Sequence, residues 1–423
     1  MQVAERHEAR PFGSRPSRVR SAARFRRWPS WPLARAGIGG GGRREATGEQ
    51  DEEREDPPHG DNVPRRDASK PDDFSLTPGG TSNAWASCMS VDISGKVVVI
   101  TGGSAGVGRA IAREMASRGA RIALIARGED RLAATRDELQ SHGAEVIAIS
   151  ADVADATRVE SAAERVERDL GPIDVWINNA MVTVLSPVAE MSAEEYDRVT
   201  RVTYLGAVHG TLSALARMRP RNAGHIIQIG SALAYRAIPL QSAYCAAKHA
   251  MRGFTDSLRS ELIHDGSAIN LTMVQLPAVN TPQFGWCRTR LDHQPQPVPP
   301  IYQPEVIARS VADIALTSRR EVWLGGSTIK TVWGSRLASA FLDHYLAKKA
   351  YSGQQTEERI DPSRPDNLHS PLPGDPGAHG QFDERARSES AAAWLAVHRA
   401  VWASAAAVMV VAMLVVGGAF WLW

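Results

Sequence analysis

Three residues in the middle of the chain have the types and spacing of a proton-transfer site. Tyr244 and Lys248 lie four residues apart in a stretch with helical spacing, so they share one face of a helix. A phenol titrates near ~10, and a neighbouring ammonium favours its phenolate. Tyr244 is therefore a candidate to accept a proton from an alcohol or to donate one to a ketone. Ser231 follows a short apolar run and is placed to hold the reacting oxygen.

A glycine-rich stretch at residues 101–108, TGGSAGVG, predicts a second part of the same site. It follows the apolar, β-branched run Lys96–Ile100, which is typical of a buried strand, and precedes residues 109–116, which have the spacing of a helix. Glycines allow a sharp turn and a close approach of a ligand, and a helix N-terminus offers free N–H groups. A glycine-rich turn without a ligand is the simpler alternative, but the flanking strand and helix favour a phosphate cradle.

The elements that must position these residues alternate along the chain. The expected strands are Lys96–Ile100, Arg121–Ala126, Glu145–Ser150, Val175–Asn178, His225–Ile229, Ile269–Gln275 and Glu321–Leu324. Helical patterns separate them, the longest over Ala193–Met218 and Gln241–His264. Such alternation predicts an α/β fold with a doubly wound parallel sheet and helices on both faces. Ligands of such sheets bind beyond the carboxyl ends of the strands, where the glycine-rich stretch lies.

The motifs, taken together, resemble those of the short-chain dehydrogenase/reductase family. The signature Thr-Gly-x-x-x-Gly-x-Gly matches residues 101–108, and Ser231 with Tyr244-x-x-x-Lys248 follows at the family's spacing. The resemblance covers residues 91 to about 324 and implies a Rossmann-like fold, an NAD(P)-dependent activity and hydride transfer between an alcohol and a ketone. It assigns catalysis to Ser231, Tyr244 and Lys248, with Lys248 also holding the nicotinamide ribose.

The resemblance also implies which residues contact the cofactor. Asn179 and Ala180 match the Asn-Asn-Ala-Gly motif, Asp152 and Val153 the adenine contact, and Pro277 and Thr281 the segment that covers the nicotinamide. The expected cofactor-binding residues are Thr101, Gly102, Gly103, Ser104, Gly106, Val107, Gly108, Arg127, Asp152, Val153, Asn179, Ala180, Tyr244, Lys248, Pro277 and Thr281. No metal site is expected.

Three residues depart from the family's pattern. Met181 and Ala278 replace loop glycines, and Thr203 stands where the family usually has an asparagine that helps to form a proton relay to the lysine. A threonine can still form hydrogen bonds, but the departure puts the relay in doubt. The sequence therefore leaves open a rival hypothesis, a non-catalytic cofactor-binding scaffold or redox sensor. The intact serine, tyrosine and lysine favour the enzyme.

The residue types after the second expected strand favour NADP(H) over NAD(H). Relatives that bind NAD place a carboxylate there for the ribose 2′-hydroxyl, whereas a cation suits a 2′-phosphate. Here Ala126 is neutral and Arg127 follows it. Glu129 and Asp130 are the counter-evidence, although acidic residues also suit the first turn of a helix.

The segment from Thr281 to Gln303 predicts a lid over the substrate. It contains Phe284, Trp286, Tyr302 and several prolines without a regular period. An aromatic and apolar lining suits a hydrophobic alcohol or ketone. His209 and His249 are assigned no role.

The ends of the chain predict separate segments. Residues 1–90 are rich in Arg, Gly and acidic residues and poor in apolar ones, which indicates disorder or a natural start at Met89 rather than a transit peptide or a nucleic-acid arm. The expected catalytic domain (91–326) is followed by an accessory helix (327–351), a polar linker (352–393) and a transmembrane helix (394–423), whose last 24 residues carry no charge. Cationic residues before that run predict a single-pass C-terminal anchor with a cytoplasmic catalytic domain.

Composition narrows the function classes. The formal charge of +2 gives no global field that favours nucleic acid. The three cysteines are too few and too scattered for a disulfide framework or a zinc site and indicate a reducing compartment. The partners expected are a small alcohol or ketone, a lipid bilayer through the C-terminal helix and, by analogy with the family, further copies of the chain.

Overall fold

The structure is a computed structural model that describes residues 92–361 and 363–399. Its centre is a seven-stranded sheet with the order β12-β7-β6-β4-β1-β2-β3, in which every neighbouring pair is parallel. The strands are β1 (Val97–Thr101), β2 (Arg121–Ala126), β3 (Val146–Ser150), β4 (Ile173–Asn178), β6 (His225–Ile229), β7 (Asn270–Gln275) and β12 (Glu321–Trp323). This arrangement confirms the predicted Rossmann-like parallel sheet.

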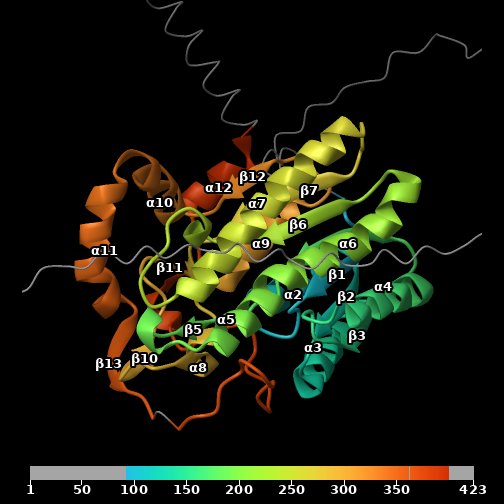
Figure 1. The fold of residues 1–423 in the computed structure, drawn as a ribbon. Coiled ribbons are helices and arrows are strands. Elements are labelled where there is room, and N and C mark those ends of the chain that lie inside the picture. Colours follow the sequence, from blue (N-terminus) through green and yellow to red (C-terminus); the bar gives the residue numbers. More distant parts are fainter. Residues whose placement is uncertain (1–91, 362, 400–423) are drawn as a thin grey trace, which may run out of the picture. The chain divides into compact units, whose positions relative to one another are not determined.

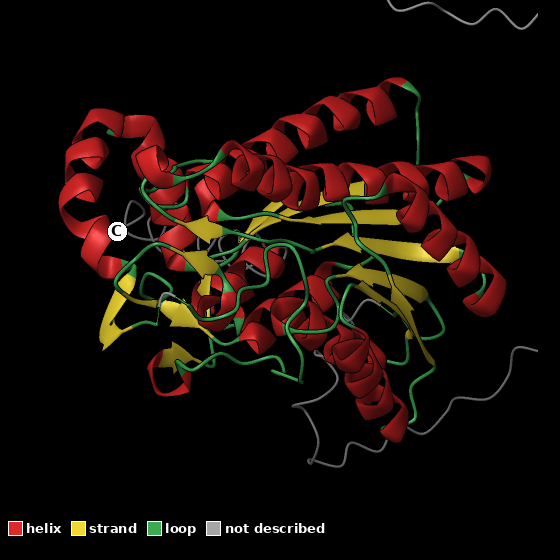
Figure 2. Cartoon of the chain, turned by 60° about the horizontal axis from the view of Figure 1, so that its bottom comes forward, coloured by secondary structure: helices red, strands yellow, loops and turns green. Residues whose placement is uncertain are grey.

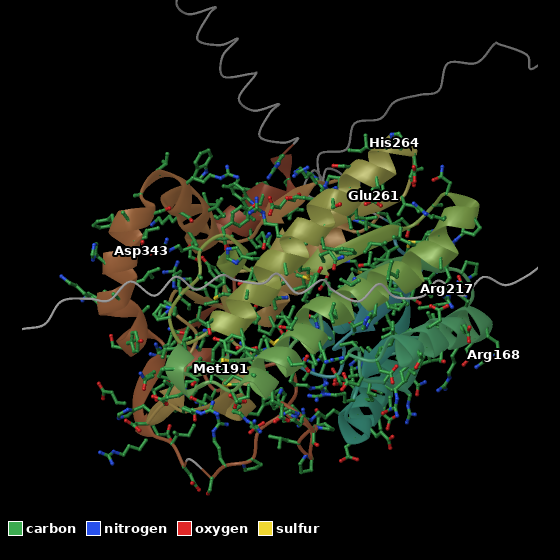
Figure 3. The ribbon with its side chains drawn as sticks, in the orientation of Figure 1. Arg168, Met191, Arg217, Glu261, His264 and Asp343 are labelled. Carbon is green, nitrogen blue, oxygen red and sulfur yellow. The ribbon has the colours of Figure 1, made fainter. Side chains whose placement is uncertain are left out.

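Helices cover both faces of this sheet (Figures 1 and 2). They are α2 (Gly106–Ser117), α3 (Glu129–Ser141), α4 (Ala156–Leu170), α5 (Ala193–Thr200), α6 (Gly206–Met218), α7 (Ser242–His264) and α9 (Pro304–Ile314). A π-helical turn, Arg201–Leu205, joins α5 to α6, so the single helix expected over Ala193–Met218 is interrupted. Between α6 and α4, the largely buried side chain of Arg217 (labelled in Figure 3) forms an ion pair with Glu160 (2.9 Å).

The alternation of side chains along the strands explains why both faces are covered. Val98 and Ile100 of β1 belong to the core that includes α2, α3 and α9, whereas Val97 and Val99 belong to the core beneath α4, α6 and α7. All five residues of β1 are buried. A parallel strand that is apolar on both faces must be covered on both.

The strand order fixes where a ligand can bind. Strand β1 lies between β2 and β4. The chain adds β2 and β3 on one side of β1 and then crosses over to add β4, β6, β7 and β12 on the other side. Such a switch point opens a crevice at the carboxyl ends of the strands. The glycine-rich stretch follows β1 at this point, and Ser231 follows β6 on the same edge.

The region after β12 packs against this edge. Two helices, α10 (Gly326–Leu337) and α11 (Ser339–Gly353), stand where one accessory helix was expected, because the backbone at Ala338 leaves the helical region (φ −143°, ψ 44°). Smaller elements are β5 (Val184–Leu185), β8 (Ala278–Val279), α8 (Gln283–Trp286), β9 (Arg288–Thr289), β10 (His293–Pro295), β11 (Ile301–Tyr302), β13 (Gln355–Arg359), β14 (Ala386–Arg387) and α12 (Ala391–Val397).

Residues 352–393, for which the composition predicts a linker, make ordered contacts with the rest of the fold. Strand β13 pairs with β10, and β14 pairs with β11. Leu368 is fully buried within the core beneath α4 and α6. In Figure 1 the orange-red segment after β13 runs along the molecule toward α3. Backbone and arginine contacts, described below, hold a segment that has no hydrophobic period of its own.

The predicted C-terminal transmembrane helix, and the single-pass anchor inferred from it, are wrong for the part of the chain that the structure describes. No helix within residues 92–361 and 363–399 is both long enough and apolar enough to cross a bilayer. The start of the expected span forms the short helix α12, which Ser390 caps and which ends before His398. Its Ala393 and Val397 pack in the core near α9. Residues 400–423, like the segment 1–91, lie outside the described residues.

Candidate active site

One continuous cavity of about 740 Å³ runs along the carboxyl ends of the strands. Of the residues predicted to bind the cofactor or to catalyse, its walls include Gly102, Ser104, Gly106, Val107, Arg127, Asp152, Val153, Asn179, Ala180, Ser231, Tyr244, Lys248, Pro277 and Thr281. Thr101, Gly103 and Gly108 do not line it. They lie behind the wall and shape it. The structure thus brings the two predicted halves of the site, the glycine-rich stretch and the serine–tyrosine–lysine set, into one space.

The glycine-rich turn is shaped by positions that tolerate no side chain. Gly102 and Gly106 have positive φ values of 66° and 55°. At Gly108 a Cβ atom would lie 2.2 Å from the carbonyl oxygen of Gly102 and 2.5 Å from the Asn179 amide nitrogen. Helix α2 can therefore begin directly against the turn, and its first residues, Gly106 and Val107, line the cavity.

Hydrogen bonds tie the ends of β1 and β4 together beneath this turn. The Asn179 side-chain amide donates to the carbonyls of Thr101 (3.0 Å) and Gly102 (3.2 Å). The Thr101 hydroxyl accepts from the N–H groups of Asn179 (3.0 Å) and Ala180 (3.2 Å). Thr101 and Asn179 therefore hold the glycine-rich turn in place, because each side chain bonds backbone groups at the end of the other residue's strand, β4 or β1.

The residues of the proton-transfer set come from β6 and α7. Ser231 begins a 3₁₀ turn directly after β6, where its N–H donates to the Gln275 side chain (2.8 Å) and its hydroxyl accepts from the Leu233 N–H (3.1 Å). Tyr244 and Lys248 lie one turn apart near the start of α7, with the Lys248 Nζ 5.7 Å from the centre of the Tyr244 ring. Lys248 is buried and donates to the Ile229 carbonyl (2.6 Å).

Burial shifts both titratable groups toward their neutral forms. It raises the pKa of the Tyr244 phenol well above its ordinary value, although interaction with the Ser231 hydroxyl acts in the opposite direction. It lowers the pKa of the Lys248 ammonium to about 7. The structure thus differs from the expectation that the ammonium lowers the phenol's pKa, because loss of hydration on burial is the largest effect on this group. A neutral phenol is the form that donates a proton.

The far end of the cavity is rich in arginine. Arg127 follows β2 and donates to the backbone carbonyls of Asn367 (2.6 Å), Leu368 (3.2 Å) and His369 (2.9 Å). Arg198 bonds the Asp152 carboxylate (2.6 Å). Burial lowers the pKa of Arg127, and the charges of Arg198 and then Arg131 lower it further, with Asp152 opposing. This end of the cavity carries more positive than negative charge.

The departures from the family's pattern are accommodated without loss of the cavity. Thr203 is buried in the π-helical turn, where its hydroxyl donates to the Val182 carbonyl (2.9 Å) and accepts from the Val182 N–H (3.1 Å). Ala278 lies in β8, an extended segment that requires no glycine. Met181 lines the cavity. The predicted lid over residues 281–303 contributes Phe284, Trp286 and the segment 296–299 to the same wall.

Several residues of the cavity could not be found from the sequence. Helix α11 contributes Leu342, Tyr345 and Leu346, and the C-terminal segment contributes Asn367 and Pro371. The sequence predicted an accessory helix over residues 327–351 but not the part of the fold against which it packs. The segment around Asn367 carries no motif or period that could have been read.

The residues present fit a nicotinamide dinucleotide. The turn has no room for side chains at Gly102 and Gly108, the N-terminus of α2 faces the cavity, and cations gather at one end and the proton-transfer set at the other. The glycine-rich turn and the start of α2 suit a pyrophosphate, and the cations at the far end suit a phosphate on the adenosine.

Known proteins point to the same conclusion. Residues 96–290 match the family model described as short chain dehydrogenase. The chain is 30% identical over 276 residues to an uncharacterized oxidoreductase of Bacillus subtilis, YxnA, a match that covers 65% of this chain and 78% of the relative.

Two solved structures share the fold. One is a short-chain dehydrogenase/reductase of Burkholderia phymatum in complex with NAD, 25% identical, with a TM-score of 0.51, covering 60% of this chain and 96% of that one. The other is L-sorbose reductase of Gluconobacter frateurii complexed with NADPH and L-sorbose, 27% identical, with a TM-score of 0.50, covering 57% and 98%. With the fold, the glycine-rich turn and the serine–tyrosine–lysine set in place, the chain belongs to the short-chain dehydrogenase/reductase family and is an NAD(P)-dependent oxidoreductase.

Proposed function

We propose that the protein transfers a hydride between NADP(H) and a hydrophobic alcohol or ketone. The observation that carries this proposal is that Ser231, Tyr244 and Lys248 line the same cavity as the glycine-rich turn. A scaffold or sensor that only binds a cofactor does not need a phenol, an ammonium and a hydroxyl at the opposite end of its pocket. The experiment that tests it is a screen of alcohols and ketones for a change in nicotinamide absorbance, with both cofactors.

When bound, the cofactor supplies or accepts the hydride. In ketone reduction Tyr244 donates its phenolic proton to the substrate oxygen, and the burial that raises the pKa of this phenol keeps the proton available. Ser231 holds that oxygen with its hydroxyl, from a backbone fixed by the Gln275 side chain. The Lys248 ammonium stabilises the negative charge left on the phenol. Alcohol oxidation uses the same groups in reverse.

The substrate end of the cavity supports a hydrophobic substrate. Leu342 and Leu346 of α11 and Phe284 and Val298 of the lid line the same cavity as Ser231 and Tyr244. An apolar wall of this kind favours substrates that lose apolar surface to water on binding. We expect kcat/KM to rise about three- to fivefold per added methylene in a series of linear ketones, which corresponds to about 0.8 kcal/mol per buried CH₂. A series that shows no dependence on chain length would contradict an apolar pocket.

The preference for NADP(H) is supported by the arginines at the adenosine end. Arg127, Arg131 and Arg198 stand near one another, and position 126 carries no carboxylate. We expect Arg127→Ala to weaken NADPH binding about tenfold or more and NADH binding by a clearly smaller factor, because only NADPH loses a charge-assisted contact to the 2′-phosphate. Fluorescence titration with the two cofactors measures this, with Arg136→Ala, a change at a partly exposed residue of α3 that does not line the cavity, as the control. Equal losses for both cofactors would show that Arg127 does not recognise that phosphate.

The lowered pKa of Lys248 predicts the pH dependence of ketone reduction. The ammonium is present below a pKa of about 7 and is lost as the pH rises through that value. Because reduction needs the charged form, kcat/KM should fall about tenfold per pH unit on the alkaline side. Lys248→Met should be slow at every pH and should lack this alkaline limb. A wild-type profile that stays flat between about pH 6 and 9 would contradict the role of the ammonium.

A further inference from the structure

The C-terminal segment that covers the arginine-rich end of the cavity is held by unusually many contacts for a polar stretch. We call residues 366–377 the strap. Besides the Arg127 contacts described above, Arg131 donates to the carbonyls of Leu372 and Gly374 (3.2 Å), and Arg109 forms an ion pair with Asp375. Both of these arginines are buried. The strap is therefore a fixed part of this end of the molecule and not a passing loop.

Contacts with the glycine-rich turn and the lid fix the register of the strap. The Gly106 N–H donates to the Gly377 carbonyl (3.1 Å), and the Asn367 N–H donates to the Trp286 carbonyl of the lid (3.0 Å). The Leu368 carbonyl accepts from Arg198 (3.0 Å), which also bonds Asp152. The strap thus joins the three elements that surround the adenosine end: the turn after β1, the residues after β2 and β3, and the lid.

The strap forms a wall of the cavity and does not fill it. Asn367 and Pro371 line the cavity together with Arg127 and Asp152, and the space continues from there to Ser231 and Tyr244. Leu368, the fully buried residue between them, packs in the core beneath α4 and α6. A plug would put that apolar side chain into the cavity and close it. The arrangement is that of a cover with a ligand space beneath it.

One polar group of the strap is left without a partner. Asn367 lines the cavity, and its side-chain oxygen accepts no hydrogen bond from the part of the chain that the structure describes. A side-chain amide at a cavity wall whose oxygen has no partner in the protein can turn that oxygen toward a donor on a ligand. Adenosine offers amino and hydroxyl donors, and an asparagine amide is the side chain that pairs with either.

We propose that the strap is the outer wall of the adenosine subsite and that Asn367 is an adenosine-binding residue. This inference rests on the proposed use of NADP(H). It assigns a cofactor-binding role to a segment that lies beyond the catalytic fold in the sequence and carries none of the family's motifs. Arg127, Arg131 and Arg198 then have two roles: they hold the strap through its carbonyls, and their excess charge faces the phosphate of the ligand.

The test measures binding of cofactor fragments and needs no turnover. We expect Asn367→Ala to weaken 2′,5′-ADP about five- to tenfold by isothermal titration, because one hydrogen bond and one satisfied buried oxygen are lost. Nicotinamide mononucleotide should bind the variant and the wild type equally. Ser370→Ala is the matched control, since Ser370 is an exposed strap residue that does not line the cavity. It should change neither affinity.

Hydrogen exchange gives a second readout on the unmodified protein. Amide exchange in peptides that cover the strap should slow when 2′,5′-ADP is added and should not respond to nicotinamide mononucleotide. Unchanged 2′,5′-ADP affinity in Asn367→Ala would overturn the inference and leave the proposed function standing. Tighter binding in that variant would also overturn it, because the strap would then compete with the ligand. A wild-type protein that binds neither NADPH nor 2′,5′-ADP would overturn both.

Discussion

Tyr244→Phe should lower kcat for ketone reduction by about three orders of magnitude and leave the affinity for NADPH within about twofold of wild type. The change removes the transferable proton, and general acid catalysis contributes typically 10²–10⁴-fold. The ring that packs in the cavity wall is kept, so the cofactor site retains its shape. Steady-state kinetics measures kcat, and a fluorescence titration measures NADPH affinity on the same preparation.

A second tyrosine provides the control for this experiment. Tyr196 of α5 shares a hydrogen bond with Ser242 (2.6 Å), near the start of α7, and does not line the cavity. Tyr196→Phe removes a hydroxyl of the same type close to the site, and kcat should stay within about twofold of wild type. Retention of more than about a tenth of the turnover in Tyr244→Phe would mean that another group donates the proton.

Gly108→Ala should abolish cofactor binding, with at least a hundredfold loss of NADPH affinity, and should lower the melting temperature. The new methyl carbon would lie 2.2 Å from the Gly102 carbonyl oxygen, a backbone atom that cannot move without opening the glycine-rich turn. It would also push against the Asn179 amide, which ties β1 to β4. Overpacking of this kind typically costs 1–3 kcal/mol even where the surroundings can give.

Gly253→Ala is the matched control for the cradle. It lies in the middle of α7, and a Cβ atom there would meet nothing within 4 Å. Alanine in a helix interior is favoured over glycine by roughly 0.5–1 kcal/mol, so this variant should be slightly more stable and should bind NADPH normally. If Gly108→Ala melted and bound NADPH like Gly253→Ala, the close packing at the turn would not be what shapes the cofactor site.

The parts of the site that the sequence predicts are those determined by neighbours along the chain. Val97–Thr101 is apolar on both faces and is followed by glycines, so strand, turn and helix follow one another within residues 96–117. Tyr244 and Lys248 share a helical turn, and their common face follows from their spacing alone. The parallel sheet follows from the alternation of such units, and so does the meeting of β1 and β6 at one edge.

The parts that the sequence does not predict depend on long-range contacts. The strap is polar and rich in Pro and Gly, which also describes a linker, and its position comes from arginines more than two hundred residues earlier in the chain. Within the residues that the structure describes, the expected transmembrane helix fails for a related reason. Hydrophobicity marked residues 394–423 for burial in a bilayer, but in the described part of that stretch Val397 is buried against the protein's own core. The pKa of Tyr244 likewise depends on how deeply the folded protein buries the phenol, and this cannot be predicted from its spacing of four residues from Lys248.

The proposed function requires that Tyr244 and the cofactor cooperate in hydride transfer to a carbonyl carbon. The most direct measurement uses NADPH that carries deuterium at both positions of C4 of the nicotinamide, with a panel of hydrophobic ketones and mass spectrometry of the alcohols formed. The account predicts alcohol that is heavier by one deuterium from the wild-type protein, and at least about a hundredfold less of it from Tyr244→Phe at equal NADPH occupancy. Equal deuterium transfer by the two proteins, or none to any ketone by a wild-type protein saturated with NADPH, would contradict it.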